Sequence, residues 1–424
     1  MVERLRFRDP ELTGRIAKKI HEIAPKKGTV KICHVCGTHE WTITHFGIRS
    51  LLPSNVEVIA GPGCPVCIIP ASEIDEAVQV AQKGVTVTCF GDVLRVPGSK
   101  MSLLDAKAEG ADVRVVYGVA DAMKMARKEP NKQFAFFAVG FETTAPSTAV
   151  ELINKPPRNM SFLISHRLIP PAMKLLVEMK DLSLNGLIAP GHASTIIGLK
   201  PYEIFPLEYG VPVVVAGFEP LDVMFGIYMI LKQLSEGKPR LENEYVRAVH
   251  WEGNVKAQEL MQAVFEPVDG NWRGLGTITS SKFTLRRKYE RYDAHSKHKV
   301  KIEHGLDTPP GCRCHLVVIG KIKPDECPLF MKACVPQKPV GACMVSSEGT
   351  CRIWAKTINS QQQIEYKKVE SMSDRSLEVT ELRERIMKLE LKIDELTKRM
   401  DNMQNYMKQL YSYLQQQGSN RSLL

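Results

Sequence analysis

Two short runs near the amino terminus carry residues that can bind metal or exchange electrons. "CGTHE" begins at Cys36, and "GPGCPVC" contains Cys64 and Cys67 as a C-x-x-C pair that encloses a proline. Two thiols at this spacing can close a disulfide, and the helix expected to begin near "PASEID" would make a thiol there more reactive. The alternatives are a tight turn with two inert thiols, or half of a zinc site without a second cysteine pair. We expect a redox-active dithiol at Cys64 and Cys67.

Cys36 lies three residues before His39, so a thiolate and an imidazole could meet at one iron. A lone Cys-x-x-His is a weak pattern by itself. Cys33 and Cys89 fall inside apolar runs, and we expect them to be small buried hydrophobic residues. The sequence reveals no partner for three other histidines, His21, His34 and His45.

A second set of cysteines lies in a segment dense in Cys, Gly and Pro that begins at Gly311. Its spacing is C-x14-C-x6-C-x16-C, formed by Cys312, Cys327, Cys334 and Cys351. Four thiolates can hold a tetrahedral zinc or a [4Fe-4S] cluster. The absence of paired C-x2-C knuckles gives the cluster a modest preference. Cys314 and Cys343 are left over, and either could exchange into the ligand set.

The elements that must position these residues are short apolar strands alternating with helices. Predicted strands begin at Val30, Val56, Val85, Val113, Phe134, Ser161, Leu187 and Val211. Stretches with helical spacing, such as "ASEIDEAVQVAQKG" and "LDVMFGIYMILKQL", lie between them. This alternation predicts an α/β fold with parallel sheets covered on both faces. Because ligand crevices lie beyond the carboxyl ends of such strands, the Gly-, Pro- and Cys-containing loops there should converge.

Changes in composition divide the chain into four expected parts. Residues 1–135 form an α/β domain with the CGTHE and GPGCPVC loops, 136–245 a second α/β domain, 246–360 an iron–sulfur domain and 368–417 a coiled-coil helix. From Val379 onward, apolar residues recur in alternating steps of three and four, with Ile or Met at a and mostly Leu at d. This pattern predicts a parallel two-stranded coiled coil and hence a homodimer. The alternative is a single amphipathic helix packed on the body of the protein.

The overall composition restricts the class of protein. The 424 residues are 44% hydrophobic and 25% charged, with a formal net charge of +10. Basic residues are dispersed except for a loose cluster between Lys282 and Lys301, and no aromatic interleaving accompanies it, so nucleic-acid binding is disfavoured. No apolar run is long enough to span a membrane, and the expected location is the cytoplasm. In that reducing compartment, 11 cysteines favour metal or redox chemistry over structural disulfides.

Eight ordered motifs together resemble the hydrogenase maturation protein HypD family. They are "HVCGTHE", "GPGCPVC", "CFGDVLRVPGS", "FFAVGFETTAP", "PGHASTIIG", "VVVAGFEPLD", "WRGLG" and "ECPLF…VGACMVSSEGTC". The resemblance covers roughly residues 10 to 356 and is highly specific. It implies two α/β domains plus a cluster domain. The tail after about residue 357 has no counterpart in the family.

The resemblance also implies a function and a set of site residues. The protein would be a scaffold for assembly of the Fe(CN)2CO unit of [NiFe]-hydrogenase, in complex with the small chaperone HypC and with cyanide from HypE and HypF. Cys36 would be the iron-binding thiolate with His39 as its neighbour, and Cys64 and Cys67 the redox dithiol. The [4Fe-4S] ligands would be Cys312, Cys327, Cys334 and Cys351. Cys33 departs from the family pattern and receives no role.

Two other functions compete with this interpretation. One is a stand-alone thiol-disulfide reductase that uses the cluster as its electron source and turns over without HypC. The other is a zinc-stabilised interaction protein, which would purify colourless with zinc and no iron. The preferred interpretation is a redox-active assembly factor rather than a free-standing enzyme. It requires the amino-terminal thiols and the cluster segment to lie close together, which the sequence does not reveal.

Overall fold

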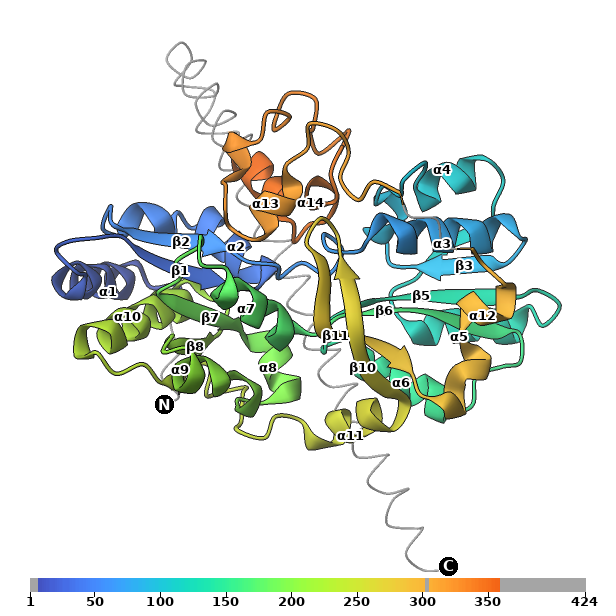
Figure 1. The fold of residues 1–424 in the computed structure, drawn as a ribbon, viewed down its shortest axis with the longest axis horizontal. Helices are drawn as coiled ribbons and strands as arrows, with labels where there is room; N and C mark the ends of the chain where they lie inside the picture. The colour runs from blue at the N-terminus through green and yellow to red at the C-terminus, as the bar shows by residue number, and fades with distance from the viewer. Residues whose placement is uncertain (1–6, 302–304, 359–424) are drawn as a thin grey trace, which may run out of the picture. The chain divides into compact units, whose positions relative to one another are not determined.

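The computed structural model describes residues 7–301 and 305–358, and every structural statement below concerns these residues (Figure 1). The predicted coiled-coil helix at 368–417 lies outside them. Among the described residues, no helix is both long and apolar enough to cross a lipid bilayer.

The first parallel sheet, sheet A, contains the strand that leads to Cys36. Its strand order is β2-β1-β7-β8-β9. The strands are β1 (Val30–His34), β2 (Val56–Ala60), β7 (Gly186–Pro190), β8 (Val213–Ala216) and β9 (Leu241–Asn243). All four pairings are parallel. β1 and β7 lie side by side within the sheet. The strand that follows β1 pairs on one side of these two, and the strands that follow β7 pair on the other side. The carboxyl ends of these two strands therefore form a topological switch point, where open α/β sheets bind ligands.

The second parallel sheet, sheet B, repeats this arrangement with four strands in the order β4-β3-β5-β6. The strands are β3 (Thr86–Cys89), β4 (Val113–Val115), β5 (Phe134–Gly140) and β6 (Met160–His166). Its switch point lies between β3 and β5. A separate antiparallel hairpin, β10 (Phe265–Trp272) with β11 (Gly276–Leu285), has an irregular register between Val268 and Gly270.

The predicted α/β class with parallel sheets is confirmed, and each of the eight predicted strands is present within one to two residues of its expected start. The sheets divide the chain differently from the expected ranges 1–135 and 136–245. Sheet A combines strands from 30–60 with strands from 186–243, and the strands of sheet B all lie between 86 and 166. An apolar run predicts a strand but does not identify its partner, so this long-range pairing was not readable from the sequence.

Helices connect and cover the strands. The α-helices are α1 (Pro10–Ile23), α2 (Gly37–His45), α3 (Ala71–Gln82), α4 (Leu103–Ala108), α5 (Val119–Lys128), α6 (Ala145–Ile153), α7 (Ile169–Glu178), α8 (Gly191–Ile197), α9 (Ile204–Glu208), α10 (Pro220–Glu236), α11 (Val255–Val264), α12 (Ala294–His298), α13 (Cys314–Val318) and α14 (Ala342–Val345). Single 3-10 turns are η1 (Ile48–Leu51), η2 (Val93–Arg95), η3 (Lys200–Tyr202), η4 (Arg287–Tyr292) and η5 (Pro324–Glu326). Residues 350–358 are also helical.

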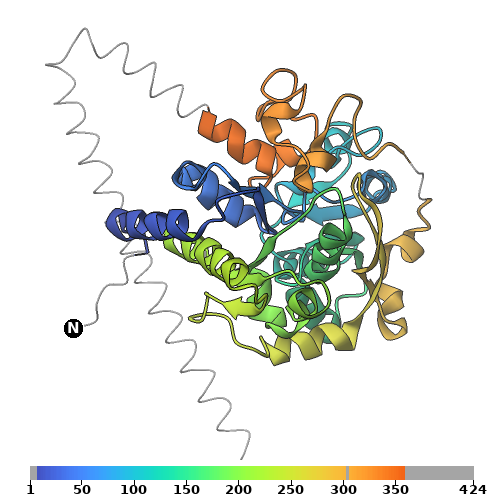
Figure 2. The ribbon, with the colours of Figure 1, turned by 60° about the vertical axis from the view of Figure 1, so that its left-hand side comes forward.

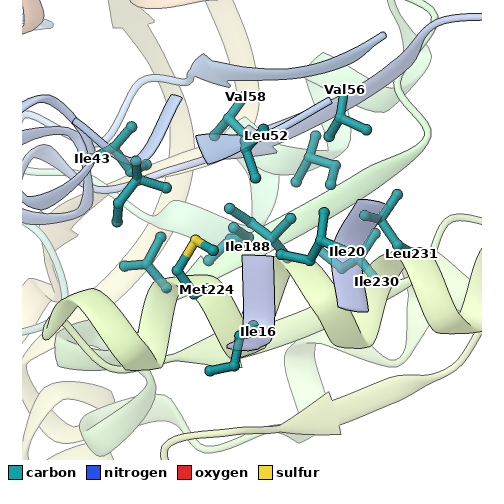
Figure 3. Close-up of a cluster of buried hydrophobic side chains, with 14 of the residues drawn as sticks. Ile16, Ile20, Ile43, Leu52, Val56, Val58, Ile188, Met224, Ile230 and Leu231 are labelled. Carbon is teal, nitrogen blue, oxygen red and sulfur yellow. The ribbon is translucent and has the colours of Figure 1, made fainter. Parts of the chain in front are cut away.

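The two longest helices, α1 and α10, pack side by side against sheet A (Figure 2). The side chain of Asp9 accepts hydrogen bonds from the first backbone N–H groups of α1, and Pro10 occupies its first turn, so the start of this helix is well specified. Figure 3 shows Ile16 and Ile20 of α1 beside Met224 and Ile230 of α10. Burial of this apolar surface stabilises sheet A and so fixes the carboxyl end of β1.

Sheet B has its own core. It includes Phe134 and Phe136 of β5, Phe162 of β6 and Leu285 of β11, all buried. The hairpin therefore packs onto sheet B, and the backbone N–H of Leu168 donates to the carbonyl of Ser281 at 2.9 Å to reinforce that contact.

A buried ion pair joins the hairpin, α3 and the end of β6. Arg167 is fully buried, and its guanidinium donates to Glu73 Oε1 at 2.8 Å and to the backbone oxygen of Asn271 at 2.8 Å. Lys282 of β11 donates to the same Glu73 oxygen at 2.6 Å. Burial acts to raise the pKa of Glu73, but Arg167 and Lys282 outweigh it and lower this pKa to about 2. The ionised form of the Glu73 carboxylate is thus stabilised by Arg167 and Lys282.

The two cations of Glu73 should contribute unequally to stability. Arg167→Met should lower the free energy of unfolding by about 3–5 kcal/mol, because it removes the buried partner of a buried carboxylate. Lys282→Met should cost about 1 kcal/mol or less, since Lys282 is partly exposed and Arg167 still pairs with Glu73. Urea unfolding of the two variants, followed by circular dichroism, measures the difference. Equal losses would contradict this account of the ion pair.

Candidate functional site

Cys36 stands at the carboxyl end of β1, where it caps α2. Its backbone is extended, and its sulfur lies near the backbone N–H groups of Thr38 and His39 in the first turn of the helix. The next residue, Gly37, is approached closely by the backbone of Glu348: a Cβ on Gly37 would lie 2.5 Å from the Glu348 oxygen. Only glycine permits this contact, which brings the 346–349 loop against the Cys36 turn.

Cys64 and Cys67 follow β2, the neighbour of β1, and are joined by a disulfide with a Cα–Cα distance of 5.4 Å. The backbone N–H of Cys67 donates to Cys64 Sγ at 3.2 Å. Gly63, just before the pair, packs on Cys36 so tightly that a Cβ there would overlap the Cys36 backbone. The pairing of β1 with β2 therefore places the disulfide beside Cys36.

A narrow pocket with a volume of about 10 Å³, room for about one water, lies where these loops meet. The groups that line it include His34, Cys36, Cys64, Cys67, Cys343 and Glu348. Cys343 and Glu348 belong to the cysteine-rich segment, nearly 280 residues further along the chain than the disulfide. The two cysteine groups of the sequence thus share one pocket.

Burial sets the protonation of Cys36. It raises the pKa of the Cys36 thiol to about 11, and the nearby Glu348 carboxylate adds to this shift. The N–H groups of His39 and Thr38 act in the opposite direction because they stabilise the thiolate. Cys36 is therefore a neutral thiol at ordinary pH.

The six cysteines of the carboxyl-terminal segment form one connected, buried group: Cys312, Cys314, Cys327, Cys334, Cys343 and Cys351. Cys312 and Cys314 are hydrogen-bonded to each other, as are Cys343 and Cys351. Cys334 interacts electrostatically with Cys312 and Cys327, and Cys351 with Cys314 and Cys334. Hydrogen bonding between thiols and burial raise the pKa of Cys312 and of Cys351 far above the ordinary value for a thiol.

This donor set suits an iron–sulfur cluster. Buried thiols with strongly raised pKa values stay protonated by themselves and become thiolates when a metal binds. Gly341 leaves space beside them, since a Cβ on that residue would lie 2.6 Å from Cys312 Sγ. In the described part of the chain, no three Cys, His, Asp or Glu side chains are close enough to hold a single metal ion. A cluster makes a different demand, because each thiolate binds a different iron.

Further contacts fix the cysteine-rich segment to both sheets. Asp92, in the loop after β3, accepts hydrogen bonds from the N–H of Ser347 at 3.0 Å and from Ser346 Oγ at 3.1 Å. Trp354 donates from Nε1 to Glu40 of α2 at 2.7 Å. α13 and α14 lie near the carboxyl ends of β1 and β2 in Figure 1, and a Cβ on Gly320 would lie 2.9 Å from the Ala60 oxygen.

His39 points away from the pocket that Cys36 lines. Its Nε2 donates to the backbone oxygen of Gly217 at 2.8 Å, and its ring stacks on Phe218. Burial lowers the pKa of His39 to about 3, so the ring is neutral. In this position, His39 fastens α2 to the end of β8. Its role as an iron ligand beside Cys36 stays a prediction.

Three residues of the site received no role from the sequence: Cys343, His34 and Glu40. Cys343 was left unassigned, yet it lines the pocket with the disulfide. His34, which had no visible partner, bonds through Nε2 to Glu40 Oε2 at 2.8 Å. The fragment "HVCGTHE" held a signal for this pair, since a residue at the end of a strand and one in the first turn of the next helix often meet. Cys33 and Cys89 are fully buried in their strands, as expected.

Comparison with known proteins places this arrangement in a family. The family model HypD, described as "Hydrogenase formation hypA family", matches residues 11–357. A putative hydrogenase expression/formation protein of Methanocaldococcus jannaschii is 48% identical over 355 residues, which is 83% of this chain and 99% of the relative. Hydrogenase maturation factor HypD2 of Bradyrhizobium diazoefficiens is 43% identical, over 81% of this chain and 94% of the relative. HypD of Escherichia coli is 42% identical, over 82% and 96% respectively. The chain therefore belongs to the HypD family of hydrogenase maturation factors.

Proposed function

We propose that this protein is a scaffold on which the Fe(CN)2CO unit of [NiFe]-hydrogenase is assembled, with redox-active thiols and a [4Fe-4S] cluster. The observation that carries the proposal is the shared pocket, in which Cys36 and the Cys64–Cys67 disulfide meet Cys343 of the cysteine-rich segment. Membership of the HypD family supports the same conclusion.

Cys36 binds the iron that is the substrate of assembly. Iron with cyanide and carbon monoxide ligands favours soft, strongly donating partners, and thiolate is the softest donor available in a protein. The N–H groups at the start of α2 stabilise the thiolate once iron has displaced the proton. Because this pKa is raised to about 11, the site releases a proton when it binds iron.

Cys64 and Cys67 store electrons for the assembly step. Opening their disulfide takes two electrons and two protons and yields two thiols beside Cys36. Cys312, Cys327, Cys334 and Cys351 would hold a [4Fe-4S] cluster, which would supply electrons one at a time. Cys343 lines the disulfide pocket and is hydrogen-bonded to Cys351, so these two residues form the short link between the two groups of sulfur atoms.

The partners follow from the proposed role. HypC would bring or receive the iron unit, and HypE with HypF would donate cyanide. The carboxyl-terminal heptads would form a homodimer, and the protein would act in the cytoplasm.

Cys36→Ala should abolish loading of the cyanide-bearing iron and leave the cluster absorption intact, because the variant removes the proposed iron ligand but none of the cluster thiols. Infrared bands of bound cyanide and carbon monoxide, measured on protein isolated with HypC, report loading. Cys33→Ala, three residues away and buried within β1, is the matched control and should load normally. Normal loading of Cys36→Ala would place the iron ligand elsewhere.

Cys334→Ala should lose most of the brown colour and the stoichiometric iron and sulfide, since a cubane needs four thiolates. Cys89→Ala is a control for the loss of one buried thiol outside the cysteine-rich segment and should keep its cluster. Anaerobic purification followed by iron and acid-labile sulfide analysis and EPR makes the measurement. A full cluster in Cys334→Ala would identify Cys314 or Cys343 as the fourth ligand.

Deletion of residues 368–424 should convert a dimer into a monomer without changing colour, because the heptads would supply the contact between subunits and no cluster ligand. Multi-angle light scattering gives the mass of each form. An unchanged mass would contradict the coiled-coil prediction.

A further inference from the structure

His34 is a buried histidine that the proposed function does not yet use. It ends β1, two residues before Cys36, and its side chain is 1% exposed. It lines the pocket together with Cys36, Cys64 and Cys67. A buried ring at the switch point of a parallel sheet, beside three sulfur atoms, stands where a ligand is expected.

One nitrogen of His34 is held by a carboxylate. Its Nε2 lies 2.8 Å from Glu40 Oε2. The other side-chain hydrogen bonds of the Glu40 carboxylate are all accepted, from Arg49, Thr44 and Trp354. The carboxylate therefore acts as an acceptor toward His34 as well, so His34 Nε2 donates.

Glu40 is itself fixed from several sides. Arg49 donates to both of its oxygens, at 2.7 and 3.0 Å, and Thr44 and Trp354 donate to Oε1 at 2.6 and 2.7 Å. The orientation of the His34 ring is thus set by a carboxylate that has little freedom to move. Histidines that bind metals characteristically have this support: the nitrogen remote from the metal donates to a carboxylate, which fixes the tautomer and the ring plane.

The other ring nitrogen, His34 Nδ1, is buried and has no hydrogen-bond partner. A neutral ring that donates from Nε2 carries its lone pair on Nδ1. Buried polar atoms without a partner are uncommon, and such an atom calls for a ligand or a water. His34 lines the same pocket as Cys36, Cys64 and Cys67, so an iron bound there by thiols would have Nδ1 of a neutral His34 as a further candidate donor.

We propose that His34 Nδ1 is a nitrogen ligand of the iron that Cys36 binds, and that Glu40 positions it. The inference rests on the proposed function of the pocket and names one further ligand there. It applies to the reduced pocket: in the disulfide state, no three donors in the described ranges gather around one ion. Opening the Cys64–Cys67 bond adds two thiols to Cys36 and His34, which completes a set of sulfur and nitrogen donors suited to iron.

His39 offers the appropriate comparison. Its Nε2 also donates, to the Gly217 oxygen, and its Nδ1 is also buried without a partner. However, His39 does not line the thiol pocket, and its ring lies against Phe218. His166, at the end of β6, has a similar arrangement: its Nε2 lies 3.0 Å from Thr148 Oγ1, and its Nδ1 is buried without a partner. Of these three described histidines, only His34 lines the pocket that contains the sulfur atoms.

The test uses the full chain with its cluster reconstituted anaerobically from Mössbauer-silent iron. Dithiothreitol opens the disulfide, supplying two electrons and two protons and leaving as its cyclic disulfide, and is then removed. One equivalent of the Mössbauer-active isotope, as Fe(II), is the probe, so the spectrum reports only the added iron. Equilibrium dialysis of the same samples gives its affinity.

His34→Gln is the main variant, because the amide of glutamine can still donate to Glu40 but offers no nitrogen at the Nδ1 position. We expect its iron affinity to fall at least about tenfold, with a changed isomer shift and quadrupole splitting. His34→Ala should show the same loss, and free imidazole should restore both affinity and spectrum. His166→Gln, the matched control, removes another buried histidine whose Nδ1 has no partner but which does not line the thiol pocket, and it should keep the wild-type spectrum. Cluster absorbance and circular dichroism establish that each variant is folded.

Wild-type affinity and spectrum in both His34 variants would overturn the inference and leave Nδ1 with a bound water only. Loss of iron in His39→Gln, with His34→Gln unaffected, would also overturn it. The Cys36→Ala variant distinguishes a failure of the His34 proposal from a failure of the proposed iron site. If it loses the probe while the His34 variants retain it, only the His34 ligand is refuted; if it also binds normally, the proposed iron site fails.

Discussion

Close backbone contact between three loops is the constraint on which the site depends. The Cys36 turn packs against Gly63 on one side, and Gly37 packs against Glu348 on the other, at distances that exclude a side chain. Substitution at either glycine would force two loops apart. The first loop follows β1, the second follows β2, and the third connects α14 to the helix at 350–358. Their contact therefore brings together sulfur atoms that are hundreds of residues apart in the sequence.

Burial gives these sulfur atoms their chemical character. Away from metal, the Cys36, Cys312 and Cys351 thiols have raised pKa values and are protonated. Neutral thiols can share a dry interior, whereas several thiolates would repel one another. Under the proposed function, a bound cation would offset the charge that burial penalises, and the site would gain charge only together with the metal.

Charged side chains join the parts around this pocket. Glu40 connects His34 of β1, Arg49 and Trp354 through one buried carboxylate. Asp92, in the loop after β3 of sheet B, accepts hydrogen bonds from the 346–349 loop. Glu73 links Arg167, which follows β6 of sheet B, with Lys282 of the hairpin. Each carboxylate joins its own element to at least one other, so polar contacts as well as apolar packing hold the two sheets and the cysteine-rich segment together.

The sequence by itself determined the α/β class, eight of the eleven strands that the structure describes, and which cysteines are candidates for redox or metal chemistry, because strand patterns and reactive residue types are local properties. Tertiary structure alone decided that β1 pairs with β7, that Cys343 shares a pocket with the Cys64–Cys67 disulfide, and that His34 rather than His39 faces it. These facts depend on which distant segments meet and on which way a ring turns once its neighbours are packed. No local pattern encodes them, since the same apolar run or Cys-x-x-His fragment is compatible with many partners.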